Sequence, residues 1–167
     1  MRIQNLITDR SSRLPGDYEP HGSEDQEAPA DAPGTAFWRG NVLTIVMPGA
    51  PIGKPRMTRR DKWAQRPAVL RYREWADRLR EVAGAVPSAS EVVDLSWTAY
   101  FVPPKSWPKK RRDEAIGTQH RSKPDLDNID KAVLDVLYPG RVQAIALGTL
   151  AKRWSRTARI EIEIETA

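Results

Sequence analysis

Two carboxylates and a lysine in the second half of the chain have the types and spacing of a metal-dependent phosphodiesterase site. Asp125 and Asp127 are two residues apart, so an extended backbone would send both side chains to the same side. Converging carboxylates can hold a hard cation. Lys131 follows Asp127 by four residues and would share its helical face. Such a lysine can stabilise the charge that develops when a phosphodiester is hydrolysed.

The same segment also has a purely structural interpretation. An aspartate before a helix commonly caps the helix N-terminus, and the other aspartate would then be solvated. Lys131 is also four residues from Asp135 and adjacent to Asp130, a spacing that makes a solvated ladder of ion pairs. Asp130 and Asp135 are therefore either surface partners of Lys131 or possible further acids for a metal.

The composition restricts the metal chemistry that is open to the chain. There is no cysteine, and His21 and His120 are the only histidines, so thiolate and histidine-rich zinc sites are excluded. A bound metal would therefore have oxygen ligands, which favours Mg²⁺ or Mn²⁺ as the cofactor. His120 is five residues before Asp125, and we expect a structural or solvated role for it.

The charge distribution favours a polyanionic partner. The chain has 27 Lys and Arg against 22 Asp and Glu, a net charge of +5, and residues 1–36 are acid-rich. Basic residues gather in segments 54–80 and 105–123, which both precede the acidic motif. Within them, we expect the loop at residues 54–66, and then residues 109–123, to neutralise DNA phosphates. The predicted DNA-binding residues are Lys54, Arg56, Arg59, Arg60, Lys62, Arg66, Lys109, Lys110, Arg111, Arg112, Arg121 and Lys123.

Each basic segment has a simpler alternative, which is a solvated charged face. Trp63 lies inside the first segment, where an exposed ring could stack on or wedge beside an unpaired base. A lone tryptophan is, however, more often part of a core.

The elements that must position these residues can be predicted from apolar periodicity. Helices are expected at residues 68–83, at 107–115 after an N-cap at Ser106, and at 128–137, directly after Asp127. Strands are expected at residues 41–47, 92–102, about 143–154 and 159–165. In the second strand, the predicted buried side comprises Val93, Leu95, Trp97, Ala99 and Phe101.

This order predicts a single small α/β (α+β) domain, with a mixed β-sheet flanked by helices, over residues 37–167. Residues 1–36 lack a sustained apolar period and are predicted to be a flexible acidic and proline-rich tail. The sequence contains no run of 18 apolar residues and no signal-peptide core. We therefore expect no membrane association and a cytoplasmic location.

The acidic motif closely resembles the core motif of the RusA-like Holliday junction resolvases. The shared segment is Lys123-Pro-Asp-Leu-Asp-Asn-Ile-Asp-Lys-Ala-Val-Leu-Asp135. The resemblance extends from about residue 42 to 164 and includes Gly53-Lys54-Pro55-Arg56, Pro104-Lys105-Ser106-Trp107 and Lys152-Arg153-Trp154.

The resemblance implies a homodimeric, Mg²⁺-dependent endodeoxyribonuclease that cuts four-way DNA junctions symmetrically, in DNA recombination and repair. Proteins of this family are frequent in phages and prophages, which implies a bacterial or phage-infected cell. By the same resemblance, Asp125 and Asp127 are metal ligands and Lys131 assists catalysis. Branched DNA is the implied partner.

The chain departs from the family pattern after the motif helix. The family normally carries an Asp-Asp pair just before a glutamine, and one of these acids completes its metal site. Here Gln143 follows Tyr138-Pro-Gly-Arg-Val142 with no acid, and the connection is several residues short. Four acids could in principle substitute: Asp130, Asp135, Glu161 and Glu163.

The missing pair leaves two alternatives to an active nuclease. One is a junction-binding homologue that is catalytically weakened or inactive. The other is a scaffold or interaction protein in which residues 125–135 form only a capped, ion-paired helix, and this alternative predicts no salt-dependent affinity for DNA.

Overall fold

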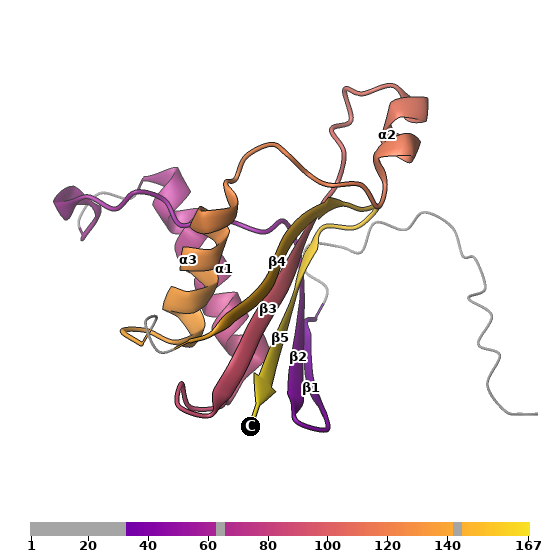
Figure 1. Cartoon of the computed structure of the whole chain (residues 1–167). Helices are drawn as coiled ribbons and strands as arrows, with labels where there is room; N and C mark the ends of the chain where they lie inside the picture. Colours follow the sequence, from indigo (N-terminus) through magenta and orange to yellow (C-terminus); the bar gives the residue numbers. More distant parts are fainter. Residues whose placement is uncertain (1–32, 63–65, 142–144) are drawn as a thin grey trace, which may run out of the picture.

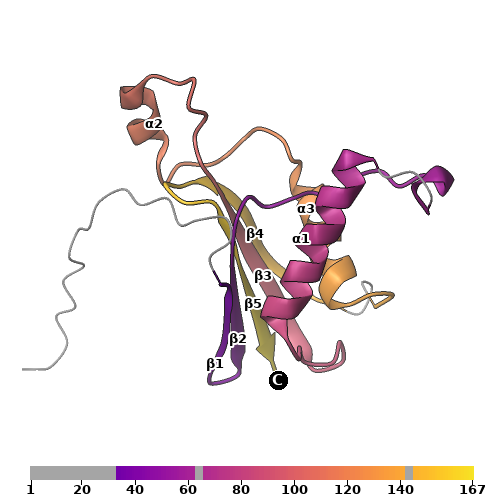
Figure 2. The same ribbon diagram turned by 180° about the vertical axis from the view of Figure 1, so that it is seen from behind.

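The computed structural model describes residues 33–62, 66–141 and 145–167. A five-stranded sheet in the order β1-β2-β5-β3-β4 forms its framework (Figures 1 and 2). Strands β3 and β4 are parallel and the other neighbours are antiparallel, which confirms the predicted single α+β domain with a mixed sheet. The strands are β1 (Thr35–Arg39), β2 (Val42–Pro48), β3 (Val92–Phe101), β4 (Leu147–Trp154) and β5 (Arg159–Thr166).

Strand β1 was not predicted, and it includes two residues of the predicted tail. It forms a hairpin with β2 in which Arg39 pairs with Val42, and Gly40 supplies the positive φ of 62° that the tight turn needs. All five residues of β1 are exposed, so the strand leaves no buried-face pattern in the sequence. The folded part therefore begins before residue 37, while residues 1–32 lie outside the described residues.

Three α-helices and a short 3₁₀ helix complete the described fold: α1 (Pro67–Ala83), α2 (Lys109–Ala115), α3 (Leu126–Leu137) and η1 (Arg59–Lys62). The predicted cap of α2 by Ser106 is wrong, because Pro108 occupies the N-cap position and makes no side-chain cap. A residue before proline is disfavoured in the helical region, so Trp107 cannot begin the helix. No described helix is long and apolar enough to cross a membrane.

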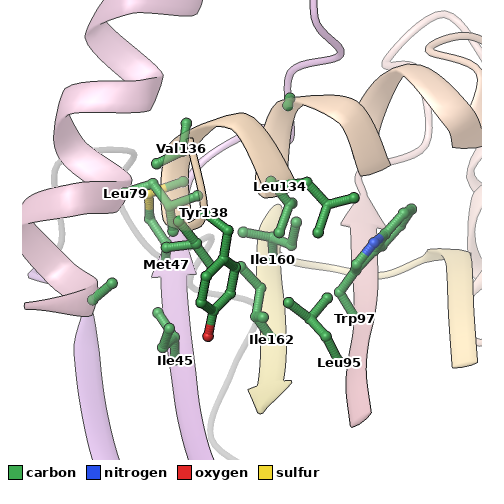
Figure 3. Close-up of a cluster of buried hydrophobic side chains, with 14 of the residues drawn as sticks. Ile45, Met47, Leu79, Leu95, Trp97, Leu134, Val136, Tyr138, Ile160 and Ile162 are labelled. Atoms are coloured by element: carbon green, nitrogen blue, oxygen red, sulfur yellow. The ribbon is translucent and has the colours of Figure 1, made fainter. Parts of the chain in front are cut away.

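Helices α1 and α3 pack on the same face of the sheet, and the core lies between them and the strands (Figures 1 and 3). Ile45, Ile162 and Trp97 are paired across β2, β5 and β3, and each is at most 2% exposed. Because α3 lies directly on this layer, the start of α3 is held at a fixed place above the sheet.

The buried face of β3 differs from the prediction at its first residues. Val92 is buried and Val93 is 47% exposed, because the register with β5 shifts between Val92 and Asp94. Such an irregularity inserts one residue and inverts the alternation on one side of it. From Leu95 onward the predicted alternation holds, with Leu95, Trp97 and Ala99 buried.

Candidate functional site

The acidic motif forms the start of α3. Asp125 occupies the N-cap position with extended backbone angles (φ −69°, ψ 149°), and its carbonyl accepts hydrogen bonds from the backbone N–H groups of Asn128 and Ile129. The helix therefore begins two residues earlier than predicted. Leu126 and Asp127 are helical, so the extended Asp125–Asp127 segment that would send both side chains to the same side is not formed. The carboxylate of Asp125 makes no capping hydrogen bond and is exposed, so it is accessible to a ligand from solvent.

Asp127 lies in the first turn of α3 and contacts Lys131 from the next turn. The Lys131 ammonium donates a hydrogen bond of 2.9 Å to Asp127, and both side chains are more than 60% exposed. This hydrogen bond is the main cause that lowers the pKa of Asp127 below its ordinary value, so the carboxylate is charged near neutral pH. Exposed ion pairs at this spacing contribute little to stability, so the pair can be exchanged for other partners at small cost.

The two other acids of α3 are engaged elsewhere. Asp130 accepts a hydrogen bond of 3.1 Å from the indole nitrogen of Trp97, and Asp135 forms an ion pair with Lys54. Within the ranges that the structure describes, no three metal-ligating side chains are gathered in one place.

Glu161 and Glu163 of β5, the two possible substitutes predicted there, lie on the opposite face of the sheet from α3. Ile160, Ile162 and Ile164 are fully buried on the helix-covered face, so the alternating Glu161 and Glu163 project to the other face. Neither can approach Asp125 or Asp127 without refolding the strand. The predicted shortened connection at Gln143 lies outside the described residues.

A basic loop lies beside the start of α3. The backbone N–H of Lys54 donates a 2.8 Å hydrogen bond to the carbonyl of Asn128, and a Cβ on Gly53 would lie 3.1 Å from side-chain atoms of Asn128 and Pro124. Glycine thus allows the loop to approach the helix closely. Lys54, Arg56 and Lys131 together line an open hollow of about 520 Å³ next to Asp127.

Asp61 organises the rest of this loop from inside it. Its carboxylate is buried and accepts two hydrogen bonds from the Arg66 guanidinium, at 2.5 and 2.6 Å, as well as one from the backbone N–H of Thr58. The Arg66 guanidinium holds the pKa of Asp61 far below its ordinary value. Arg66 also donates to the carbonyl of Arg56, so Arg66 acts as an internal support of the loop.

Replacing Asp61 by asparagine is expected to loosen this loop and to speed tryptic cleavage after Arg59 and Arg60, which are exposed. Because the pKa of Asp61 is lowered in the folded state, its ionised carboxylate stabilises the fold at pH values above the ordinary pKa of 3.8. This stabilisation is lost progressively as the pH falls below 3.8 and the carboxylate becomes protonated. The stability difference between wild type and Asp61→Asn, measured by urea unfolding, should therefore be full near neutral pH and shrink below pH 3.8. A pH-independent difference would contradict the assigned role.

The remaining predicted DNA-binding residues fall into separate groups. Arg121 and Lys123 are exposed on the segment that leads into Asp125, whereas α2 stands beyond the end of the sheet, apart from α3 (Figure 1). On α2, Lys109 pairs with Asp113, Lys110 pairs with Glu114, and Arg111 stacks at 3.8 Å on the ring of Trp107. The side chain of Lys62 and the whole of Trp63 lie outside the described residues.

Lys152 was missing from the predicted site, and it supports the segment that carries Asp125. Its ammonium donates hydrogen bonds of 2.7 Å to the carbonyls of Ser122 and Pro124. The segment before Ser122 runs alongside β4. Backbone hydrogen bonds join Gly117, Thr118 and His120 to the backbone of that strand. The only signal for Lys152 in the sequence is its place in the Lys152-Arg153-Trp154 segment of the family resemblance.

His120 packs beneath this segment. Its ring stacks on Phe101 and meets Trp154 edge-on, each at 4.2 Å between ring centres, and it is 4% exposed. Burial, and then the nearby Lys152 charge, lower the pKa of His120, so the ring is neutral near pH 7. The expected structural role of His120 agrees with this packing.

Replacing Lys152 by methionine is expected to destabilise the fold by about 1–3 kcal/mol, since two charge-assisted hydrogen bonds are lost. Because these bonds fix the carbonyls just before Asp125, the rate of any reaction at the acidic motif should fall about tenfold. Lys152→Arg retains N–H donors and should recover most of both losses. Thermal unfolding and reaction rates equal to wild type in Lys152→Met would contradict the role.

The comparisons agree with the motif and with the fold around it. The sequence matches the family model described as Endodeoxyribonuclease RusA over residues 48–165, which is more than half of the chain. No curated protein matches significantly. The matched span runs from the end of β2 through most of β5 and includes Asp125, Asp127 and Lys131. The chain therefore belongs to the RusA endodeoxyribonuclease family.

Proposed function

We propose that the protein is a Mg²⁺- or Mn²⁺-dependent endodeoxyribonuclease that resolves four-way DNA junctions by phosphodiester hydrolysis, in DNA recombination and repair. The observation that carries this proposal is the pair Asp125 and Asp127, exposed at the start of α3 beside Lys131, in a chain of the RusA family. A scaffold protein with only a capped, ion-paired helix here would show no salt-dependent affinity for DNA, and this difference distinguishes it from the proposed function.

The side chains present fit a hard divalent cation. Asp125 and Asp127 offer only oxygen donors, and neither carboxylate is occupied by a helix cap or a buried contact. Mg²⁺ in phosphoryl-transfer sites is commonly held by one or two carboxylates together with waters and substrate oxygens. The two acids at the start of α3 are therefore a sufficient protein contribution, although a third would bind the cation more tightly.

Each residue has a role that follows from its position. Asp125 and Asp127 would hold the cation, which, when bound, supplies charge neutralisation at the phosphate and activation of water. The Lys131 ammonium, one turn from Asp127, would donate to a non-bridging phosphate oxygen and stabilise the charge that develops as water attacks phosphorus and the P–O bond breaks. Lys54 and Arg56 would hold the neighbouring phosphates across the hollow.

Symmetric cutting requires two copies of the site. A four-way junction presents two equivalent strands, so a homodimer with a two-fold axis can place one α3 at each of them. We therefore propose a homodimer as the functional unit.

A second candidate is a protein that binds junctions but does not cut them. It is favoured by the lack of a third acid near Asp125 and Asp127 in the part of the chain that the structure describes. Both candidates require salt-dependent affinity for branched DNA, and they differ only in product formation.

The test is cleavage of an end-labelled four-way junction and of a linear duplex of the same sequence, with Mg²⁺ or with EDTA. The proposed function predicts paired, symmetric nicks in the junction, intact duplex, and no product in EDTA. Junction binding without nicks in Mg²⁺ would favour the second candidate. Equal cutting of duplex and junction would refute junction specificity.

A further inference from the structure

A second basic feature lies on α2, well separated from the start of α3 (Figure 1). A cleft of about 240 Å³ opens between α2 and the segments that follow β3 and β4. Four cationic side chains line it together with one carboxylate, and its remaining walls are apolar. The charged residues are Lys105, Lys109, Arg112, Arg156 and Asp113.

Lys105, Lys109 and Arg112 alone outnumber the single carboxylate in the cleft. Asp113 accepts a 2.9 Å hydrogen bond from Lys109, and this contact, with smaller contributions from Arg156 and Arg112, lowers the pKa of Asp113. Lys105 has no carboxylate partner among the described residues. A cleft with an excess of positive charge and partly apolar walls attracts anions more strongly than an open surface does.

Arg112, which lines this cleft, also carries an unsatisfied donor. The Nε–H of Arg112 is buried and has no acceptor in the part of the chain that the structure describes. Buried N–H groups without a partner are rare, and each calls for an acceptor supplied by water or a ligand. On a simple solvated face, the donors would be hydrogen-bonded to water. Arg112 therefore differs from Lys110 on the same helix, whose side chain is exposed.

We propose that the α2 cleft is a phosphate-binding site that holds a backbone phosphate of a DNA arm outside the cutting site, with Lys105 and Arg112 as its donors. This proposal rests on the proposed function, because the arms of a junction are the DNA that extends past the scissile phosphate. Among the predicted basic residues of α2, it assigns direct phosphate contact to Arg112 and leaves Lys110 and Arg111, which lie outside the cleft, to act only through their charge.

Inorganic phosphate tests the cleft without DNA. In a titration of the full chain followed by NMR of arginine side chains, the Arg112 Nε–H signal should shift saturably, and Lys105→Gln should weaken this binding about tenfold. Arg80→Gln removes the same charge from α1, where Arg80 pairs with Asp77, and should leave the titration unchanged. An Arg112 signal that shifts only linearly with phosphate would overturn the proposal.

Junction binding in EDTA tests the role of the site. Lys105→Gln and Arg112→Gln should each weaken binding about tenfold and reduce the salt dependence by about one phosphate contact, with Arg80→Gln as the control. Lys105 is exposed in a turn, so its variant keeps the test valid if Arg112→Gln folds poorly. Wild-type affinity in the Lys105 variant would overturn the cleft alone, whereas no affinity for junctions in wild type would overturn the proposed function as well.

Discussion

Asp127→Asn is expected to lower the rate of junction nicking about a thousandfold, because a neutral amide neither holds a divalent cation well nor provides its charge. Affinity for the junction in EDTA should stay equal or rise slightly, since one negative charge that repels the phosphates is removed. The fold should be unaffected, because Asp127 is exposed and makes only the contact with Lys131 and local helix hydrogen bonds. Single-turnover nicking and gel-shift titration measure the two quantities separately.

The control for this substitution is Asp77→Asn. Asp77 is an exposed acid on α1 that pairs with Arg80, so its replacement makes the same chemical change away from α3. Nicking by this variant should match wild type. If Asp127→Asn nicked as fast as Asp77→Asn, the assignment of Asp127 as a metal ligand would be wrong.

Lys131→Met is expected to lower the nicking rate about a hundredfold while allowing the divalent cation to bind more tightly. In wild type, Lys131 forms a 2.9 Å ion pair with the Asp127 carboxylate and therefore competes with any cation for it. Its removal frees Asp127 but also removes the donor that would stabilise charge on the phosphate. The opposite signs of the two effects distinguish a catalytic lysine from one that only pairs with Asp127.

Mn²⁺ titration followed by electron paramagnetic resonance, combined with nicking rates, tests this combination. Lys131→Arg keeps the charge and should retain part of the rate, with Mn²⁺ affinity near that of wild type. Tighter Mn²⁺ binding together with an unchanged nicking rate in Lys131→Met would show that the lysine belongs only to a surface ion pair.

Most of the fold follows from local pattern, and the exceptions have local causes. β5 and α1 are predictable because their buried residues recur at steps of two and of three to four, as Ile160, Ile162 and Ile164 show. β1 is not predictable in this way, since its side chains are all exposed and its pairing with β2 gives no alternation. The start of α2 depends on the residue before Pro108, a backbone effect that outweighs the capping signal of Ser106.

The site was predictable where it depends on short spacing and unpredictable where it depends on contacts across the chain. Asp127 and Lys131 are four residues apart on one helix, and the structure brings them together at that spacing. Lys152 donates to Ser122 and Pro124 from a strand about 30 residues away in the sequence, so no local sequence pattern predicts these hydrogen bonds. The burial of Asp61 within a highly basic loop is likewise a property of the folded loop.

Asp125 and Asp127 at the start of α3, without the acidic pair usual in the family, are proposed to be enough for metal-dependent cutting. The most direct measurement is single-turnover nicking of a labelled four-way junction, fully bound by the wild-type protein, as Mg²⁺ is raised from zero. The proposed site predicts a rate that starts at zero, rises and saturates with Mg²⁺, and produces symmetric nicks. A junction that stays fully bound and intact at every Mg²⁺ concentration would contradict the claim and identify the protein as a junction-binding relative that has lost its cutting activity.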